Sequence, residues 1–527
     1  PHHFAALQLF EHQLLLPIPD IDRTQFLLVI GGNPLVSNGS LMTAPDIARR
    51  LKDLRGRNGQ LIVVDPRRTE TADMADQHLF IKPGTDAWLL LAMLQVIFTE
   101  RLEKLGRLET FTTGLDELRT TVAAFTPERA AAHTQIAAAD IRDLARRFAK
   151  SDSAVCYGRM GVSTQAFGAL CQWLIQALNI VTGNLDRPGG AMFTRPAFDA
   201  LGLSSAMGQR GSYDRRRTRV RALPEFGGEF PVAALAEEIL TPGEGQIKAL
   251  VTAAGNPVLS TPNGRQLDQA LAQLDFMVSV DIYINETTRH AHYILPPTFG
   301  LERDHYDLIF HALAIRNTTK YSSALLEPDP GSMHDWQIFD QLVRHIEAAD
   351  RSRQRPWLDR LRSRWLTPQR ALALGLRFGP YGSGWNPFGA GLTLAKVAAS
   401  PHGIDLGPLQ PCLPDRLFTR NKTIQLVPPV LRNDLERLEN NVRETPPASL
   451  TLSLIGRRDL RTNNSWLHNS RRFIKGPNRC TLLMHPTDAT ARQLESGCLV
   501  TVTSRTGSVR IELEVSDEIA PGVVSLP

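Results

Sequence analysis

The sequence predicts an α/β fold in which two similar α/β units are followed by a strand-rich C-terminal domain. Three observations support this prediction. A pattern of strand, glycine turn, helix, strand and aspartate occurs twice, about two hundred residues apart. Its strands are short apolar runs of the kind that parallel sheets bury on both faces. The last eighty or so residues instead contain alternating apolar and polar side chains around a turn, which is typical of a β-hairpin.

The first copy of the pattern begins with the apolar run 26–30. The residues GGNP at 31–34 then predict a turn, because Gly and Pro favour backbone conformations that end a strand. Helical spacing follows at 44–54, and a second apolar strand at 61–64 ends at Asp65. This order predicts a β–turn–α–β unit with an acid at the tip of its second strand.

The second copy has the same order. A strand is expected at 247–252, a GNP turn at 255–257, a helix at 263–274 and a strand at 276–280 that ends at Asp281. Shared spacing of so many features indicates a true structural repeat.

The match continues beyond the acid. A Glu-Thr pair follows five residues after each aspartate, at 70–71 and 286–287. His78 stands five residues before a proline, and so does His292. We therefore expect the two histidines to fill equivalent structural places.

Each part of the repeat suits a nucleotide. Glycine lets backbone N–H groups approach a phosphate, and a helix N-terminus adds positive potential. An aspartate at the end of the next strand can accept hydrogen bonds from a ribose or from the N–H groups of guanine. The alternative is that Asp65 and Asp281 only cap the turns that follow them. Neither copy has the Walker lysine or a full GxGxxG, which argues against an ATPase or an ordinary NAD enzyme. Two units imply two nucleotides, or one large cofactor with a nucleotide at each end.

Composition is that of an ordinary globular protein. The chain has 527 residues, 42% hydrophobic and 21% charged, with a formal net charge of +5. This small charge gives no indication of a nucleic-acid partner, and no apolar run is long enough to predict a membrane span. The five cysteines form no CxxC motif, so no zinc or iron–sulfur site is expected within the sequence.

Motifs along the chain resemble the catalytic subunits of the molybdopterin oxidoreductases, the family that includes dimethyl sulfoxide reductase and formate dehydrogenase. They are GGNPLVS, VVDPRRTETA, IKPGTDAWLLLAM, GRMGVSTQAFGALCQWLIQALNIVTGNLDRPGG, AAGNPVLS and ETTRHAHYILPP. Near the C-terminus, LIGRRDLRTNNSWLHNSRR and HPTDATARQLESGCLVTVTSRTGSVRIELEVSDEIAPGVV are similar to the β-barrel domain of the family. The resemblance covers most of the chain apart from about 350–447.

The resemblance implies two pseudo-symmetric Rossmann-like α/β domains and a C-terminal β-barrel of the double-psi type that caps the cofactor. The expected boundaries are 1–205 for the first α/β domain, 206–345 for the second, 346–447 for an irregular or helical connection, and 448–527 for an incomplete barrel. The two GNP turns are expected to face one another across a cleft.

The resemblance also implies a cofactor, bis(molybdopterin guanine dinucleotide) with molybdenum or tungsten. Carried over residue by residue, the site of the first dinucleotide comprises Gly32, Asn33, Pro34, Ser37, Asp65, Arg67, Pro83, Gly84, Thr85 and Asp86. The site of the second comprises Gly255, Asn256, Pro257 and Asp281. The barrel residues expected at the pterins are Thr462, Asn463, Asn464, Ser465 and His468.

Two features of the family fall outside the sequence. The [4Fe–4S] cluster of such enzymes is expected only in a segment before Pro1, and the protein ligand to the metal is expected at or before Pro1. We interpret both ends of the sequence as interior positions of a longer protein. His2 and His3 then lie where the chain leaves the metal site, which makes them candidates for contact with substrate; the alternative is a surface terminus.

The expected function is two-electron redox chemistry on a small molecule, with formate as the first choice because GRMGVSTQ and TGNLDRPGG are most similar to formate dehydrogenases. Nitrate or another oxo-transfer substrate is the alternative. A non-catalytic cofactor-binding homologue and a two-site nucleotide-dependent transferase are the other classes considered. We expect an electron-transfer partner protein or subunit, and a cytoplasmic location.

Overall fold

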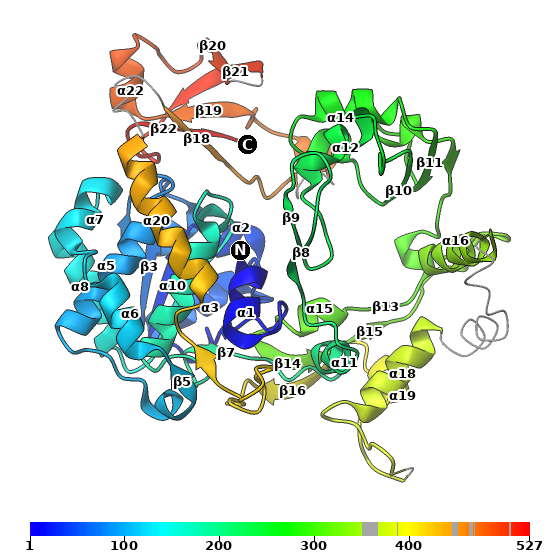
Figure 1. The fold of residues 1–527 in the computed structure, drawn as a ribbon, viewed down its shortest axis with the longest axis horizontal. Helices are drawn as coiled ribbons and strands as arrows, with labels where there is room; N and C mark the ends of the chain where they lie inside the picture. The colour runs from blue at the N-terminus through cyan, green and yellow to red at the C-terminus, as the bar shows by residue number, and fades with distance from the viewer. Residues whose placement is uncertain (350–366, 387, 445–451, 463–466, 468, 505–506) are drawn as a thin grey trace. The chain divides into compact units, whose positions relative to one another are not determined.

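The computed structural model describes residues 1–349, 367–386, 388–444, 452–462, 467, 469–504 and 507–527 (Figure 1). These residues divide into two compact units. Unit 1 comprises Pro1–Arg195, Phe310–Asn317 and Gly407–Pro527. Unit 2 comprises Pro196–Ile309 and Thr318–Leu406. The predicted boundaries at 205, 345 and 447 stay predictions.

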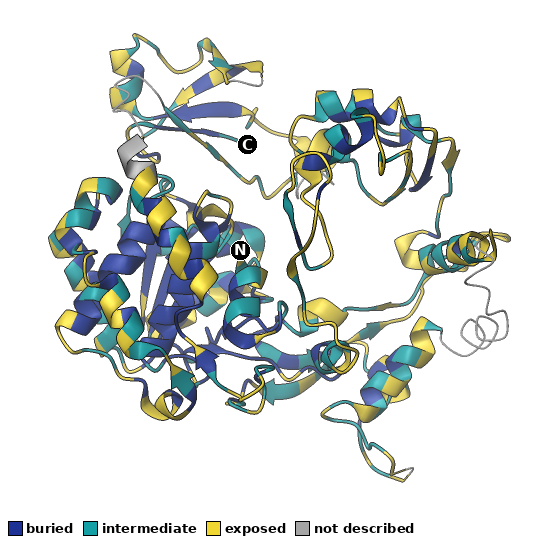
Figure 2. Cartoon of the chain, in the orientation of Figure 1, coloured by how far each residue is buried: buried dark blue, intermediate teal, exposed yellow. Residues whose placement is uncertain are grey.

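Unit 1 is built on a four-stranded parallel sheet in the order β4-β3-β2-β6. The strands are β2 (Phe26–Ile30), β3 (Gln60–Val64), β4 (Gln77–Leu79) and β6 (Ala154–Gly158). All five residues of β2 and of β6 are buried, as expected for strands that are covered on both faces (Figure 2). The predicted strands at 26–30 and 61–64 are confirmed.

Helices surround this sheet, and the most apolar helices contribute to the hydrophobic core of unit 1. Helix α5 is buried over most of its length and packs against α7, α8 and α10, while α10 also packs on β6. The helices of four or more residues in the N-terminal part of unit 1 are α1 (His2–Phe10), α2 (Pro34–Ser37), α3 (Ile47–Gly56), α4 (Glu70–Met74), α5 (Asp86–Thr99), α6 (Leu115–Val122), α7 (Pro127–Thr134), α8 (Ala138–Lys150), α9 (Met160–Ser163) and α10 (Gly168–Val181).

The C-terminal part of unit 1 is a five-stranded mixed sheet in the order β18-β22-β19-β21-β20. Its strands are β18 (Ser453–Gly456), β19 (Thr481–Met484), β20 (Leu499–Thr503), β21 (Ser508–Val515) and β22 (Val523–Leu526). β20 and β21 pair antiparallel, with Thr503 opposite Ser508, so the predicted hairpin is confirmed. Helix α20 (Pro429–Glu444) precedes this sheet and packs on α10.

Unit 2 contains a three-stranded parallel sheet in the order β10-β11-β12. The strands are β10 (Ala249–Ala253), β11 (Phe276–Val280) and β12 (Tyr293–Ile294), and the neighbouring helices are α12 (Leu235–Leu240), α13 (Pro257–Ser260) and α14 (Gly264–Leu271). One apolar cluster joins α12 and α14 to β11 through Ile239, Leu267 and Met277. The predicted second β–turn–α–β pattern is therefore present.

Unit 2 also contains a hairpin-like pair of strands and several further helices. The pair is β8 (Tyr213–Arg217) with β9 (Pro224–Phe226). The further helices are α11 (Ala200–Ala206), α16 (Asp335–Ala349), α18 (Pro368–Phe378) and α19 (Leu394–Ala398). No helix within the described ranges is long and apolar enough to cross a membrane.

Candidate functional site

The GNP turn of unit 1 is fixed by backbone contacts with the short helix α9 that follows β6. Gly31 has φ +56°, and its N–H donates to the carbonyl of Val64 at 2.9 Å. The N–H of Gly161 donates to the carbonyl of Gly31, also at 2.9 Å. A Cβ on Gly31 would lie 2.5 Å from the backbone nitrogen of Val162. Glycine is therefore required here both by conformation and by space.

Asn33 joins this turn to the segment that follows the acid. Its Nδ2 donates to Oε2 of Glu70 at 2.6 Å, and its Oδ1 accepts from Oγ1 of Thr71 at 2.7 Å. The same Thr71 oxygen accepts from the N–H of Leu35 at 3.2 Å. The Glu-Thr pair predicted as part of the repeat thus fastens the end of β3 to the GNP turn.

Unit 2 repeats this network atom for atom. Asn256 donates from Nδ2 to Oε2 of Glu286 at 2.7 Å and accepts at Oδ1 from Thr287 at 2.7 Å. The N–H of Val258 donates to Oγ1 of Thr287 at 3.1 Å. The structural repeat predicted from the sequence is confirmed at this level of detail.

The predicted equivalence of His78 and His292 is wrong. His292 accepts at Nδ1 from the N–H of Met277, whereas the corresponding N–H in unit 1, that of Leu61, donates to Asp76. His78 instead contacts the carbonyl of Asp65 through Nε2, at 3.0 Å. Counting from the aspartates aligns His292 with Asp76, because both residues lie eleven positions after their acid. The matching distance to a proline was a coincidence.

Both aspartates cap the turns that follow them, as the alternative interpretation expected. Asp65 accepts at Oδ1 from the N–H of Arg67 at 3.0 Å, and Asp281 accepts at Oδ1 from the N–H of Tyr283 at 2.9 Å. Neither side chain forms a further hydrogen bond with the part of the chain that the structure describes. One carboxylate oxygen of each acid is thus available to a ligand.

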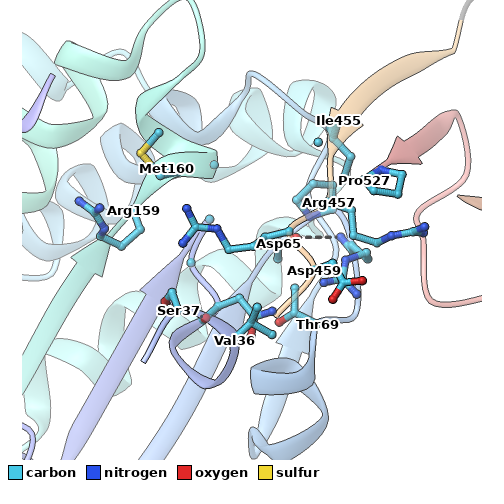
Figure 3. Close-up of a pocket in the computed structure, with 18 of the residues that line it drawn as sticks. Val36, Ser37, Asp65, Thr69, Arg159, Met160, Ile455, Arg457, Asp459 and Pro527 are labelled. Atoms are coloured by element: carbon cyan, nitrogen blue, oxygen red, sulfur yellow. Dashed lines mark hydrogen bonds between the residues drawn. The ribbon is translucent and has the colours of Figure 1, made fainter. Parts of the chain in front are cut away.

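A cavity of about 1280 Å³ opens in unit 1 at the carboxyl ends of β2 and β3 (Figure 3). Figure 3 shows Asp65 with Arg159 and Met160 on one side and Arg457 and Pro527 on the other. The first pair lies directly after β6, where α9 begins, and the second pair directly follows strands β18 and β22 of the C-terminal sheet. This is the edge of the sheet at which open α/β folds bind ligands.

The structure brings most of the residues predicted for the first dinucleotide into this cavity. Those that line it are Gly32, Asn33, Ser37, Asp65, Arg67, Pro83, Gly84 and Asp86, together with Thr462 from the barrel set. Pro34 and Thr85 do not line it; Pro34 begins α2, and Thr85 is the residue before α5. The predicted Asn463, Asn464, Ser465 and His468 lie outside the described residues.

Positive charge dominates the described lining of the cavity. The charged side chains are six arginines against three aspartates: Arg67, Arg159, Arg457, Arg458, Arg461 and Arg479, with Asp65, Asp86 and Asp459. Arginine presents flat, forked donors that match phosphate oxygens. A cavity of this size and charge suits an extended anion such as a dinucleotide pyrophosphate.

Two of the three aspartates have a raised pKa. Burial raises the pKa of Asp65 to about 7, against a smaller opposing effect of the Arg67 N–H and guanidinium. Burial likewise raises the pKa of Asp86 to about 6, although Gln165 donates to it from Nε2 at 2.7 Å. Near neutral pH Asp65 is therefore only partly ionised, whereas Asp86 is mostly ionised, so Asp65 offsets less of the positive charge than the count of side chains suggests.

The segment 65–70 that follows β3 is called the acid loop. The cavity arginines outside the acid loop were missed in the sequence analysis. Arg159 donates from Nε to Oγ of Ser40 at 2.6 Å, and burial lowers its pKa. Arg457 donates to the carbonyls of Arg479 and Thr481, both at 3.0 Å. The motifs GRMGVSTQ and LIGRRDL contain these residues, so an arginine next to a strand end or turn was the available signal.

His2 does not reach this cavity. It lies in the first turn of α1 and lines a separate small cavity, of about 10 Å³, with Cys156 and Gln176. Burial, and then the charge of Arg159, lower the pKa of His2 well below its usual value. His3 is the next residue of the same helix. Contact of either histidine with substrate stays a prediction.

In unit 2 the predicted residues also lie together, at the carboxyl ends of two neighbouring parallel strands. The GNP turn at 255–257 follows β10, and Asp281 follows β11, its parallel neighbour. Asn256 links the two through Glu286 and Thr287, as described above. The assignment of Gly255, Asn256, Pro257 and Asp281 to a second dinucleotide stays a prediction, as does that of the first set.

No group of three or more His, Cys, Asp or Glu residues that could hold a metal ion occurs within the described ranges.

Comparison with known proteins agrees with the resemblance read from the motifs. The family model described as molybdopterin oxidoreductase matches residues 3–345, and the one described as molydopterin dinucleotide binding domain matches residues 452–527. The chain therefore contains a domain type that binds a molybdopterin dinucleotide.

Three relatives and one solved structure illustrate what this chain is similar to. The F420-dependent formate dehydrogenase subunit alpha of Methanocaldococcus jannaschii is 25% identical over 97% of this chain and 72% of its own. The assimilatory nitrate reductase catalytic subunit of Bacillus subtilis is 28% identical over 64% of this chain and 48% of its own. Formate dehydrogenase H of Escherichia coli is 27% identical over 62% and 46%.

The solved structure is acetylene hydratase from Pelobacter acetylenicus, with a TM-score of 0.71 and 18% identity over 100% of this chain and 73% of that one. This likeness confirms the predicted fold class. Because the first family model alone covers well over half of the sequence, the chain belongs to the molybdopterin oxidoreductase family.

Proposed function

We propose that this chain is the cofactor-binding catalytic polypeptide of a molybdenum or tungsten enzyme that oxidises formate. The observation that carries the proposal is the arginine-rich cavity of unit 1, which Asp65 also lines. The bound metal would supply two-electron redox chemistry, while the polypeptide binds the cofactor, orients substrate and excludes competing reactions.

The described residues fit one dinucleotide of such a cofactor. The arginines of the cavity would neutralise its pyrophosphate, which is an anion of the kind that guanidinium groups bind in a bidentate way. The free oxygen of Asp65 would accept an N–H of guanine, a donor that the equivalent edge of adenine does not offer in the same geometry. We therefore assign the guanine form of the cofactor, with the equivalent set in unit 2 holding the second dinucleotide.

Formate is proposed because formate dehydrogenase polypeptides are among the relatives, and that of Methanocaldococcus jannaschii is similar over 97% of this chain. Nitrate is the second candidate substrate, since the nitrate reductase catalytic subunit of Bacillus subtilis is 28% identical to this chain over 64% of its length. Because the Methanocaldococcus jannaschii relative is the alpha subunit of its enzyme, an electron-accepting partner subunit is also proposed. A cytoplasmic location stays a prediction.

The test uses protein expressed from its complete reading frame. Metal content, guanine released by acid hydrolysis, and reduction of a dye by formate would be measured on the same preparation. The proposal requires molybdenum or tungsten, two guanines per metal, and formate-dependent dye reduction. Nitrate-dependent oxidation of a reduced dye without formate activity would replace formate by nitrate. Protein with metal and guanine but neither activity would indicate a non-catalytic homologue, and protein that binds free nucleotide without metal would indicate a transferase.

A further inference from the structure

Three exposed apolar residues follow the aspartate of unit 2. Ile282, Tyr283 and Ile284 are 47%, 69% and 81% exposed. The side chain of Tyr283 forms no hydrogen bond or ring contact with the described part of unit 2. Exposed apolar groups gathered at one place on a protein commonly mark a binding site.

The backbone of this loop is firmly held beside the GNP turn of the same unit. The N–H of Tyr283 donates to Asp281 at 2.9 Å, and its carbonyl accepts from Oγ1 of Thr288 at 2.8 Å. The preceding threonine, Thr287, donates to Asn256 of the turn at 2.7 Å. Tyr283 is thus an exposed ring on a fixed backbone, next to an acid with a free oxygen.

The repeat identifies the counterpart of Tyr283 in unit 1 as Arg67. Both residues lie two positions after their aspartate, and both donate a backbone N–H to it. Arg67 lines the large cavity, and its side chain is 11% exposed. A guanidinium group and an aromatic ring differ in charge, but both are flat and both stack on heteroaromatic rings.

We propose that Tyr283 stacks its ring on the face of the purine base bound in unit 2, while Asp281 accepts hydrogen bonds from the edge of that base. The inference rests on the proposed function for the identity of the base as guanine. Ile282 and Ile284, its neighbours along the chain, are also exposed and add apolar surface to this loop.

The experiment is a calorimetric titration of the full chain with guanosine diphosphate, using protein made in a host that lacks the cofactor. An Asp65→Ala background weakens the first site, so that the second is measured. Replacement of Tyr283 by Ala in this background should weaken binding about 5- to 150-fold, the range found for loss of a base–aromatic stack. Tyr283→Phe, which keeps the ring, should bind within about twofold of the parent. Tyr293→Ala removes another exposed tyrosine of unit 2, 61% exposed on β12, and should have no effect.

Each outcome decides the inference. Equal affinity of the Ala variant and the parent overturns it, and leaves the proposed function standing if the complete enzyme still contains two guanines per metal. Equal loss in the Phe and Ala variants also overturns it, because the hydroxyl rather than the ring would then be responsible. Failure of the parent to bind guanosine diphosphate overturns the stacking role as well; the metal and dye measurements then judge the proposed function independently.

Discussion

Asn33 and Glu70 lie 37 positions apart in the sequence, yet Nδ2 of the first donates to Oε2 of the second at 2.6 Å. The bond connects the turn after one strand with the helix after the next. Asn256 and Glu286 form the same bond in unit 2, at 2.7 Å. Because the same bond occurs in both units, the GNP turn and the segment after the aspartate form one structural unit in each.

Replacement of Asn33 by Ala should therefore destabilise unit 1. The change removes the acceptor of the buried Thr71 hydroxyl, and an unsatisfied buried polar group costs about 1–3 kcal/mol. Chemical denaturation of the cofactor-free protein measures this loss. Asn256→Ala is the matched variant in unit 2 and should produce a loss of similar size. An unchanged midpoint in both variants would show that the network does not contribute to stability.

The contact between Gly31 and Gly161 gives a second prediction. A Cβ on Gly161 would lie 2.9 Å from Cα and 3.0 Å from the carbonyl oxygen of Gly31, which forces the two loops apart. Gly161→Ala should lower the free energy of unfolding by about 1–3 kcal/mol. Gly56→Ala is the control, because a Cβ there meets nothing within 4 Å and Ala favours a helix by about 0.5–1 kcal/mol. Equal stability of the Gly161 variant and the wild type would contradict the observed approach.

The raised pKa of Asp65 predicts an unusual pH dependence of stability. The folded state keeps the proton up to about pH 7, while the unfolded carboxyl releases it near the ordinary aspartate pKa of 3.8. The folded state then binds more protons between these values, so stability falls as pH rises through this window. Asp65→Asn should stabilise the cofactor-free protein at pH 8 by on the order of 4 kcal/mol, and this gain should disappear below about pH 4. A gain that is the same at both pH values would contradict burial of the acid.

Charge in the cavity can be tested at Arg159. Arg159→Gln removes one guanidinium and its hydrogen bond to Ser40, so binding of guanosine diphosphate at the first site should weaken about tenfold or more at low salt. The difference should shrink as ionic strength rises, because salt screens charge interactions. Arg146→Gln is the control, since Arg146 pairs with Glu100 away from the cavity lining. Equal affinities of the Arg159 variant and the control would remove this arginine from the site.

The sequence predicted the local parts of the fold well. Strands β2 and β11 have the predicted bounds, because an apolar run followed by a turn is a signal carried by adjacent residues. Both GNP turns and both acids were recognised for the same reason. The structural equivalence of Asp76 in unit 1 and His292 in unit 2 was missed. Each side chain accepts a hydrogen bond from a strand N–H fifteen positions earlier in the sequence, and spacing alone does not reveal such a contact.

The contacts that place the C-terminal sheet beside the cavity were only partly predicted. Contacts such as that of Arg68 N–H with the carbonyl of Glu518, 450 positions away, join the acid loop to the C-terminal sheet. Nothing in the spacing of the sequence identifies which arginines such contacts bring together. The return of Phe310–Asn317 to unit 1 was missed for the same reason, since chain order does not determine tertiary packing.

The central claim is that Asp65 and Asp281 each hold one guanine of a two-ended cofactor. It is tested most directly by counting guanine against metal in the complete protein and in Asp65→Ala and Asp281→Ala variants, with Asp53→Ala as a surface control. A buried charge-assisted hydrogen bond contributes about 1.5–3 kcal/mol, so each loss should weaken retention about ten- to a hundred-fold. The account predicts two guanines per metal in the wild type and the control, and depletion of guanine and metal in both variants. Two guanines per metal retained by both variants would mean that these aspartates only cap their turns.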